Sequence, residues 1–239
     1  KALVTGASGF IGGHVRTALL ARGDDVVAIR RKGSPPSKKG RSVEAEYDDR
    51  AALDRIVRDE KPDYVFHVAG ATKGVAYDDF RQGNVVPTAN LAAAVREHHP
   101  ALSRFVLVSS LSVYGPSTKS RPVVETDVPR PIEHYGTSKL EAEHALMAHE
   151  SAFAWSIIRP AAVYGPADSD AFELFKLAKR GLNVFYGNRE KLGSWVYVDD
   201  LVAAILLAAT HPAARGQGYL VDDGVPLTWD RVQAHIFDA

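Results

Sequence analysis

The amino-terminal stretch constrains this chain more than any other, because three evenly spaced glycines directly follow a short apolar run. The run from Ala2 to Val4 has no polar alternation, which is typical of a strand buried on both faces. Gly6, Gly9 and Gly12 come next, and apolar residues then recur at helical spacing over 15–20. A strand that turns on glycine into a helix presents free backbone N–H groups and the positive end of a helix dipole. This arrangement predicts a pyrophosphate-binding turn.

The spacing of these glycines is G-x-x-G-x-x-G, whereas the standard fingerprint is G-x-G-x-x-G. The prediction therefore depends on the strand before the glycines and the helix after them. We expect Gly6 to permit the turn, Gly9 to let the backbone approach the phosphates, and Gly12 to let helix and strand pack closely.

The following segments alternate between short apolar runs and amphipathic stretches. Strands are predicted at 25–29, 43–47, 62–70 and 104–108, and helices at 48–59 and 84–98. This alternation predicts an α/β fold, with a doubly wound parallel sheet between layers of helices. His67 lies inside one predicted strand, and we interpret it as a hydrogen-bonded core histidine rather than a ligand.

The predicted second strand ends in the basic run Arg30, Arg31 and Lys32. In such a sheet this position lies beside the adenosine ribose, where an acidic residue binds the 2′-OH of NAD and an arginine accommodates the 2′-phosphate of NADP. Arg30 stands 18 positions after Gly12, where the acidic residue is expected. A guanidinium can also bind a phosphate through two hydrogen bonds. The sequence therefore favours NADP over NAD, and the alternative explanation is a solvated basic loop.

Hydroxyl groups gather where the predicted strand at 104–108 ends, and a tyrosine–lysine pair follows. Ser109 and Ser110 lie at the carboxyl edge, where open α/β sheets bind their ligands. Tyr135 and Lys139 are four residues apart in a predicted helix and therefore share one face. A phenol has a pKa of about 10, and a nearby ammonium or an oxidised nicotinamide favours its phenolate. The pattern predicts a proton-transfer pair with a serine that holds the substrate oxygen.

Five motifs occur in an order that resembles a known family. They are Thr5-Gly-Ala-Ser-Gly-Phe-Ile-Gly12, Phe66-His-Val-Ala-Gly70, Val108-Ser-Ser-Leu-Ser-Val-Tyr-Gly115, Tyr135-Gly-Thr-Ser-Lys139 and Arg159-Pro-Ala-Ala-Val-Tyr-Gly-Pro166. Together they resemble the extended short-chain dehydrogenase/reductase family, which includes NAD-dependent epimerases and dehydratases, over nearly the whole chain. The resemblance implies a Rossmann-like sheet with a smaller carboxy-terminal substrate lobe.

The resemblance also implies roles for the residues after the fifth strand. Tyr135 is expected to be the catalytic acid/base, and Lys139 to lower its pKa and bind the nicotinamide ribose. Ser110 is expected to polarise the substrate, with Ser109 as the alternative.

Cofactor contacts are implied along the same edge of the sheet. Glu46 and Tyr47 match the adenine-contacting pair, for which the family usually has Asp-Leu. Arg30 replaces the aspartate common in NAD-using members, a second reason to favour NADP. The full set of expected contacts is Gly6, Ser8, Gly9, Phe10, Ile11, Gly12, Arg30, Arg31, Glu46, Tyr47, Val68, Ala69, Gly70, Asn84, Ser109, Tyr135, Lys139, Pro160 and Val163. No metal site is predicted.

The pattern is looser after residue 165. We expect a helix at 171–180 and strands at 183–186 and 218–221. Asp199 and Asp200 are interpreted as a helix cap rather than a metal site. The predicted division is a nucleotide-binding domain over 1–160 and a substrate lobe over 161–239, of which the part near 195–210 returns to the main domain. Members of the family that the chain resembles usually continue beyond 239 residues, so we expect that either part of the lobe or internal segments are missing from this sequence.

Two substrate classes remain open for this lobe. The diphosphate of a nucleotide sugar would need basic residues, for which the candidates are Arg159, Lys176, Lys179, Arg180, Arg189 and Lys191. An apolar ketone would need aromatic residues, for which the candidates are Phe172, Phe175, Phe185 and Trp195. Solvated surface charge and lobe core are the respective alternative explanations.

The leading functional hypothesis is an NAD(P)-dependent oxidoreductase that transfers hydride at a secondary alcohol or ketone. The alternative is a nucleotide-sugar epimerase or dehydratase with tightly bound NAD. A third reading, a non-catalytic dinucleotide sensor, is disfavoured because Ser110, Tyr135 and Lys139 are all present.

The amino-acid composition limits the classes of molecule that the protein is expected to bind. Lys+Arg and Asp+Glu both total 29, which gives no support for nucleic acid as a partner. Cysteine is absent, which excludes disulfides and thiolate metal sites and fits a reducing compartment. The longest apolar run, 201–209, is too short to span a bilayer. We expect a cytoplasmic protein without membrane contact that acts on a small molecule, and the resemblance implies a homodimer through the helices at 84–98 and 135–149.

Overall fold

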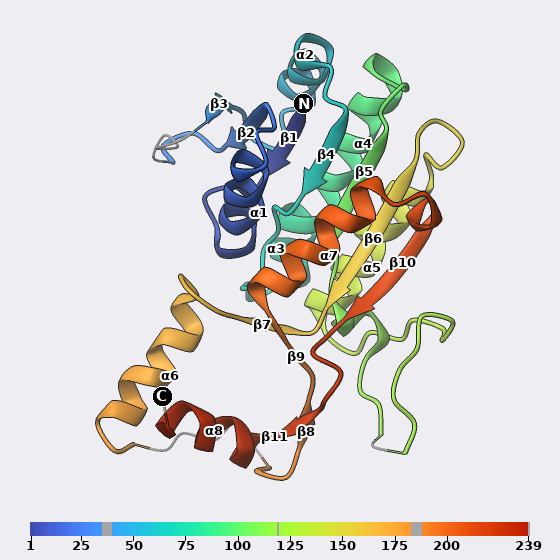
Figure 1. Ribbon diagram of the computed structural model, residues 1–239. Coiled ribbons are helices and arrows are strands. Elements are labelled where there is room, and N and C mark those ends of the chain that lie inside the picture. The colour runs from blue at the N-terminus through green and yellow to red at the C-terminus, as the bar shows by residue number, and fades with distance from the viewer. Residues whose placement is uncertain (35–39, 119, 183–187, 239) are drawn as a thin grey trace.

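The computed structural model describes residues 1–34, 40–118, 120–182 and 188–238. Its centre is a seven-stranded sheet in the order β10-β6-β5-β4-β1-β2-β3, in which every neighbouring pair is parallel (Figure 1). These strands are β1 (Ala2–Thr5), β2 (Val26–Arg30), β3 (Arg41–Glu44), β4 (Tyr64–His67), β5 (Arg104–Val108), β6 (Trp155–Pro160) and β10 (Gln217–Val221). The predicted doubly wound, Rossmann-like α/β fold is confirmed.

Helices cover both faces of the sheet (Figure 1). One layer contains α1 (Phe10–Ala21) and α7 (Val198–Thr210), and the other contains α2 (Arg50–Glu60), α4 (Val86–His98) and α5 (His134–Met147). Successive strand residues enter opposite cores, since Leu3 packs on the α2–α4–α5 side and Val4 on the α1–α7 side. No helix in the described ranges is both long and apolar enough to cross a membrane.

The third strand is predicted at 43–47, whereas the observed strand β3 spans Arg41–Glu44. β3 is an edge strand whose residues are all exposed or half-buried, so no buried apolar run marks its bounds in the sequence. The helix predicted at 48–59 begins instead at Arg50, because the Asp49 side chain caps it by accepting the Ala52 N–H at 2.9 Å.

The helix predicted at 84–98 is preceded by an irregular turn. The short helix α3 (Tyr77–Phe80) leads into a π-helical turn over Arg81–Val85, and α4 follows. A π turn inserts one extra residue into the helical repeat, and such turns are frequent at functional sites. Here it places Asn84 in the protein interior.

The carboxy-terminal part contributes to two regions. β10 pairs with β6, and α7 packs on α1, β5 and β6, so both belong to the main sheet. A smaller lobe lies beyond the carboxyl edge of the sheet (Figure 1). It comprises α6 (Ser169–Lys179), α8 (Trp229–Asp238) and the strand pairs β7 (Ala162–Tyr164) with β9 (Trp195–Tyr197) and β8 (Leu192–Gly193) with β11 (Leu227–Thr228). The strand predicted at 183–186 lies outside the described residues.

The amino-terminal end of α7 corrects the interpretation of Asp199 and Asp200. The residue at the cap position is Tyr197, whose side chain makes no capping hydrogen bond. The two aspartates occupy the first helical turn instead, where carboxylates favour the positive end of the helix dipole. Asp199 also lies 3.4 Å from His14 Nδ1 on α1.

Candidate active site

A cleft of about 1830 Å³ runs along the carboxyl edge of the sheet, across the ends of β1, β2, β4, β5 and β6. The strand order reverses between β1 and β4, and parallel sheets bind their ligands at such a switch point. The structure brings every residue predicted for catalysis or cofactor binding to this one cleft. The full set is Gly6, Ser8, Gly9, Phe10, Ile11, Gly12, Arg30, Arg31, Glu46, Tyr47, Val68, Ala69, Gly70, Asn84, Ser109, Ser110, Tyr135, Lys139, Pro160 and Val163.

The glycine turn has the geometry that a pyrophosphate requires. Gly6 has φ +67°, and a Cβ there would lie 2.7 Å from the Ala69 nitrogen. A Cβ on Gly12 would lie 2.2 Å from the Gly6 carbonyl oxygen, so only glycine lets α1 start this close to β1. Gly9 occupies the cap position of α1 and has no side chain to satisfy the first N–H groups of the helix. These groups line the cleft and fit the phosphates of a dinucleotide.

The basic run after β2 is partly committed to structural contacts. Arg30 Nη1 lies 2.6 Å from Glu44 Oε2 and donates to the Ser34 carbonyl oxygen at 3.0 Å. Arg31 lines both the cleft and an adjoining cavity of about 330 Å³. The arginine on which the NADP prediction rests is therefore engaged by Glu44, and Arg31 is the better placed of the two toward the cavity.

Tyr47 joins the phosphate turn to the adenosine end of the cleft. Its hydroxyl accepts the Gly6 N–H and donates to the Ile29 carbonyl oxygen, both at 3.1 Å. Burial raises the pKa of this phenol, so it is protonated and can donate. The residue predicted to contact adenine thus also fixes the position of the glycine turn.

Ser110 and Tyr135 face each other at the end of β5. The Ser110 side chain interacts with the Tyr135 phenol, and the Phe80 ring packs edge-on against Tyr135, with ring centroids 6.2 Å apart. Burial raises the pKa of Tyr135; the Ser110 hydrogen bond opposes this rise and the Glu133 carboxylate adds to it. The phenol is therefore protonated at neutral pH. This differs from the expectation that Lys139 lowers its pKa, so a phenolate here requires further positive charge.

Lys139 lies one helical turn after Tyr135 and is buried. Its Nζ donates to the Val108 carbonyl oxygen at 2.7 Å. Burial lowers the pKa of this amine to about 8, and the Glu143 carboxylate partly opposes the effect. A Cβ on Gly70 would lie 3.4 Å from the Nζ, so the glycine leaves the amine room at the cleft floor.

A buried network beneath the cleft distinguishes the two serines. Glu143 accepts two hydrogen bonds from Arg159, at 2.9 and 2.7 Å, and one from the Ser109 hydroxyl at 2.5 Å. Arg159 also donates to the Tyr114 hydroxyl at 2.8 Å. Ser109 is thus committed to Glu143, whereas Ser110 faces Tyr135. Sequence reasoning missed Glu143, although its position four residues after Lys139 places it on the same helix face.

The irregular turn before α4 anchors Asn84 between the cleft and the helix that carries Tyr135. Its Oδ1 accepts the Ala71 N–H at 2.8 Å, and its Nδ2 donates to the Ala71 carbonyl oxygen at 3.0 Å and to Ser138 Oγ at 2.9 Å. His67, which is fully buried, lies between the hydroxyl groups of Thr5 and Thr88. The interpretation of His67 as a hydrogen-bonded core histidine is confirmed.

The far end of the cleft, which the expected cofactor contacts leave free, is rich in carboxylates. Its acidic lining residues in the described ranges are Glu133, Asp168, Glu190 and Asp222. Besides Lys139, the lysines that line the cleft in the described ranges are Lys73 and Lys191. Hydroxyl groups of serine and threonine complete much of this lining, at Ser112, Ser117, Thr118, Ser169 and Ser194. This end is polar and carries more negative than positive side chains.

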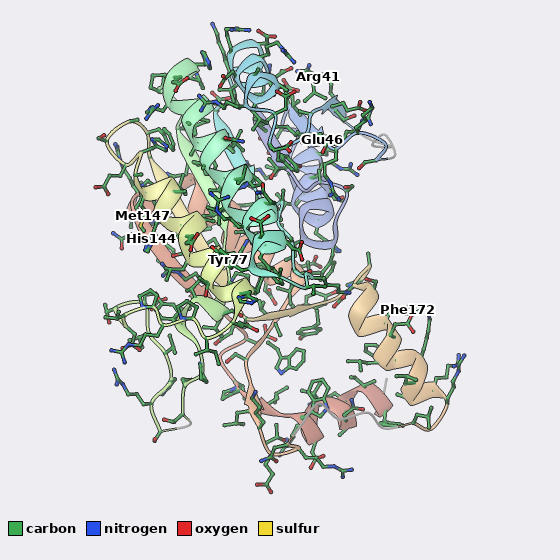
Figure 2. All side chains as sticks on the ribbon, turned by 180° about the vertical axis from the view of Figure 1, so that it is seen from behind. Arg41, Glu46, Tyr77, His144, Met147 and Phe172 are labelled. Carbon is green, nitrogen blue, oxygen red and sulfur yellow. The ribbon has the colours of Figure 1, made fainter. Side chains whose placement is uncertain are left out.

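Most of the lobe residues considered for substrate binding lie elsewhere. Of the basic candidates, Lys191 lines the cleft, whereas Arg159 is buried against Glu143 and Lys176 pairs with Glu173 on α6. Phe172 is exposed on α6 (Figure 2). Trp195 stacks on Trp229 as part of the lobe core, with ring centroids 5.8 Å apart. Phe185 lies outside the described residues.

Comparisons with known proteins agree with this geometry. A family model described as "NAD dependent epimerase/dehydratase family" matches residues 2–221. A UDP-glucose 4-epimerase of Vibrio cholerae is 30% identical over 235 residues, covering 93% of this chain and 70% of the relative. A 2-alkyl-3-oxoalkanoate reductase of Stenotrophomonas maltophilia is 31% identical over 242 residues, covering 95% and 72%.

Solved structures give the same result at the level of the fold. A UDP-glucose 4-epimerase of Thermotoga maritima with UDP-glucose has a TM-score of 0.89 and 26% identity, covering 99% of this chain and 81% of that chain. A Thermus thermophilus UDP-glucose 4-epimerase in complex with NAD has a TM-score of 0.87 and 26% identity, covering 99% and 82%. This chain therefore belongs to the NAD-dependent epimerase/dehydratase family of extended short-chain dehydrogenases/reductases and is an NAD(P)-dependent enzyme.

Proposed function

We propose that this enzyme reduces an uncharged, hydroxyl-bearing ketone with NADPH and uses Tyr135 as the proton donor. The observation that carries the proposal is the Ser110–Tyr135 hydroxyl pair in the cleft, whose phenol is kept protonated by burial. A protonated phenol at neutral pH suits the reduction of a carbonyl, which requires an acid. The Stenotrophomonas relative, named as a reductase of an oxo substrate, supports the same direction of reaction.

The residues of the cleft divide the work of this reaction. When bound, the nicotinamide cofactor supplies the hydride to the carbonyl carbon. Tyr135 donates its phenolic proton to the carbonyl oxygen, and the Ser110 hydroxyl binds the same oxygen. The products are the alcohol, the oxidised cofactor and a tyrosinate that solvent reprotonates. The glycine turn and the first turn of α1 would hold the pyrophosphate, and Lys139 would bind the nicotinamide ribose. The charge of Lys139 stabilises the tyrosinate that forms.

The preference for NADPH rests on the residues after β2. Arg31 lines the cavity beside the adenosine end, and Arg30 lies next to it in its pair with Glu44. A guanidinium there favours a 2′-phosphate. We expect Arg31→Ala to lower the NADPH/NADH affinity ratio by about tenfold, and Arg30→Ala to lower it less. Fluorescence titration with both cofactors measures this ratio, and a wild type that prefers NADH would contradict the proposal.

The second candidate function is a nucleotide-sugar epimerase, which the names of the Vibrio and Thermotoga relatives favour. Such a substrate brings a diphosphate into the end of the cleft beyond Tyr135. The described lining there has four carboxylates, Glu133, Asp168, Glu190 and Asp222, against two lysines, Lys73 and Lys191. Carboxylates at short range repel phosphate, so the lining supports an uncharged substrate over a nucleotide diphosphate.

A substrate panel tests these alternatives directly. The purified chain is mixed with NADPH and either uncharged hydroxyketones or UDP-sugars, and cofactor oxidation and sugar epimerisation are followed. We expect a hydroxyketone to cause oxidation of NADPH, and we expect Tyr135→Phe to abolish this oxidation. Tyr219 lies outside the cleft, so Tyr219→Phe should leave the oxidation rate unchanged. Epimerisation of a UDP-sugar without net cofactor oxidation would establish the second candidate instead. Cofactor binding with no turnover of any substrate would favour a dinucleotide sensor.

We also propose a homodimer and a cytoplasmic location. The helices α4 and α5 pack side by side on one face of the sheet (Figure 1), and a second copy would pair with them to form a four-helix interface. The absence of cysteine fits a reducing compartment. Light scattering on the purified chain measures the mass, and a monomer at micromolar concentration would contradict the dimer.

A further inference from the structure

The proposed reaction assigns no step to His67, a fully buried imidazole at the end of β4. Its Nδ1 lies 2.8 Å from Thr5 Oγ1, and its Nε2 lies 3.0 Å from Thr88 Oγ1. Burial, together with repulsion from Lys139, lowers its pKa to about 3. The ring is therefore neutral at physiological pH and carries its proton on one nitrogen.

The two threonines determine which nitrogen carries the proton. The Thr5 hydroxyl oxygen already accepts two backbone N–H groups just after β4, at 3.1 and 3.0 Å, so its own proton is available for His67 Nδ1. The Thr88 hydroxyl donates to the Asn84 carbonyl oxygen at 2.7 Å, so its oxygen accepts from His67 Nε2. The neutral ring is therefore the Nε2–H tautomer.

This pair of hydrogen bonds is the middle of a longer chain. At one end, Thr5 directly precedes Gly6 and the phosphate-binding turn. At the other end, Asn84 Nδ2 donates to Ser138 Oγ at 2.9 Å, and the Ser138 hydroxyl donates to the Tyr135 carbonyl oxygen at 2.8 Å. These hydrogen bonds thus connect β1, β4, α4, the π turn before α4, and α5, and so link the glycine turn to the backbone of Tyr135.

We propose that His67 and Thr88 are positioning residues that fix the phosphate-binding turn relative to the helical turn carrying Tyr135. The inference rests on the proposed role of Tyr135 in the cleft. Buried polar groups destabilise the fold unless every one of them is hydrogen-bonded. The hydrogen bonds that link Thr5 to Tyr135 pair each donor with an acceptor. Precise spacing matters because a misplacement of about 1 Å at a reacting group can reduce the rate about 100-fold.

The tautomer is tested without any substrate. Nitrogen NMR of the uniformly ¹⁵N-labelled chain at pH 7 reads the protonation of each histidine ring, and the His67 signal is assigned by its loss in His67→Asn. We expect a neutral ring with the proton on Nε2. A proton on Nδ1, or a doubly protonated ring, would overturn the proposal.

A matched pair at position 88 separates hydrogen bonding from packing. Thr88→Ser keeps the hydroxyl and loses a methyl group, whereas Thr88→Val keeps the shape and loses the hydroxyl. We expect Thr88→Ser to retain kcat and the NADPH Kd within about twofold. Thr88→Val should lower kcat by about tenfold and raise the NADPH Kd, with the substrate KM little changed. If Thr88→Ser is impaired as much as Thr88→Val, the role is packing and the proposal is overturned.

A second pair at position 67 keeps the test decisive if Thr88→Val does not fold. The Asn oxygen replaces the Nδ1 acceptor toward Thr5, and the Gln amide replaces the Nε2 donor toward Thr88. We expect His67→Asn to retain the NADPH Kd better than His67→Gln, because the Thr5 link lies nearer the cofactor turn. Equal NADPH Kd values in the two variants would contradict the proposed chain of hydrogen bonds. Full turnover in Tyr135→Phe would remove the proposed function, whereas the tautomer and NADPH measurements would still decide the role of His67.

Discussion

Burial of the Lys139 amine in the cleft floor destabilises the folded protein. Its pKa falls from 10.5 to about 8 because the amine is buried. The folded state therefore binds this proton less tightly than the unfolded chain does, and the difference corresponds to about 3 kcal/mol. This cost is full below pH 8 and is relieved as the pH rises from about 8 to 10.5.

Replacement of this lysine should stabilise the protein while removing its activity. We expect Lys139→Met to raise the free energy of unfolding by about 1–2 kcal/mol at pH 7, because the lost hydrogen bond to Val108 offsets part of the gain. The advantage should disappear as the pH approaches 10.5. Urea unfolding of both proteins at several pH values measures it. A difference that does not vary with pH would show that Lys139 carries no buried charge.

The neighbouring serines should respond to substitution in opposite ways. Ser110→Ala removes the hydroxyl that faces Tyr135, so we expect turnover to fall by about 100-fold with a small loss of stability. Ser109→Ala removes a donor from buried Glu143, so we expect a loss of about 1.5–3 kcal/mol in unfolding free energy and a smaller effect on turnover. Steady-state kinetics and urea unfolding on both variants give the comparison. The reverse assignment of effects would exchange the roles of the two serines.

At the residue scale, the sequence predicted residues that meet in the cleft but not the groups that hold them in place. The spacing of Tyr135 and Lys139 follows from helical geometry alone, and both lie in the cleft. The commitment of Ser109 depends on Glu143 and Arg159, which come from other elements. Adjacent serines cannot be distinguished by pattern when a distant part of the chain determines which one is engaged.

At the element scale, the junction of β1 and α1 should tolerate alanine at one glycine and not at its neighbour. A Cβ on Gly12 would lie 2.2 Å from the Gly6 carbonyl oxygen, whereas the nearest atom to a Cβ on Gly13 is 3.7 Å away. We expect Gly12→Ala to reduce NADPH affinity at least about tenfold and to destabilise the fold by about 1–3 kcal/mol.

The matched control is Gly13→Ala, which adds the same methyl group one residue further along the helix. It should leave NADPH affinity unchanged and stabilise α1 by up to about 1 kcal/mol. Fluorescence titration and thermal unfolding of both variants test the pair. Similar effects of the two substitutions would show that close packing of the turn is unimportant.

Elements were predictable where burial determines their pattern. Every residue of the strand at 104–108 is buried, and the predicted bounds of this strand match the observed ones. The edge strand β3 was misplaced because none of its residues is buried. The π turn before α4 has no pattern of its own, because the contacts of Asn84 with Ala71 and Ser138 define it in space.

At the scale of the whole molecule, His67 should make stability sensitive to acid. Its pKa is about 3 in the folded state against an ordinary value of 6.5. The unfolded chain binds this proton more tightly than the folded protein does. The stability that neutral His67 contributes is therefore fully present above pH 6.5 and is lost as the pH falls toward 3. We expect unfolding free energy to fall between these values, with His67 accounting for up to about 5 kcal/mol.

The variant His67→Asn isolates this contribution from that of the carboxylates. Its unfolding free energy should vary less steeply with pH between 6.5 and 3 than that of the wild type. Urea unfolding in that range measures both slopes. Identical slopes would mean that His67 is charged in the folded protein or not buried.

The whole architecture was predictable in its sheet and less so in its lobe. Regular alternation of buried runs and helices determines a doubly wound sheet, and the motifs lie in order along its carboxyl edge. The lobe depends on two- and three-residue strands that pair across long sequence separations, such as β8 with β11. Such short pairings leave no periodic pattern in the sequence.

The most direct test of the account is a single-turnover measurement of hydride transfer. Protein loaded with NADPH is mixed rapidly with the hydroxyketone found in the panel, and nicotinamide absorbance is followed for the wild type and Tyr135→Phe. We predict equal NADPH affinity within about twofold and a transfer rate that is about 100- to 10,000-fold lower in the variant. Equal transfer rates in the two proteins would show that Tyr135 is not the proton donor and would contradict the proposed chemistry.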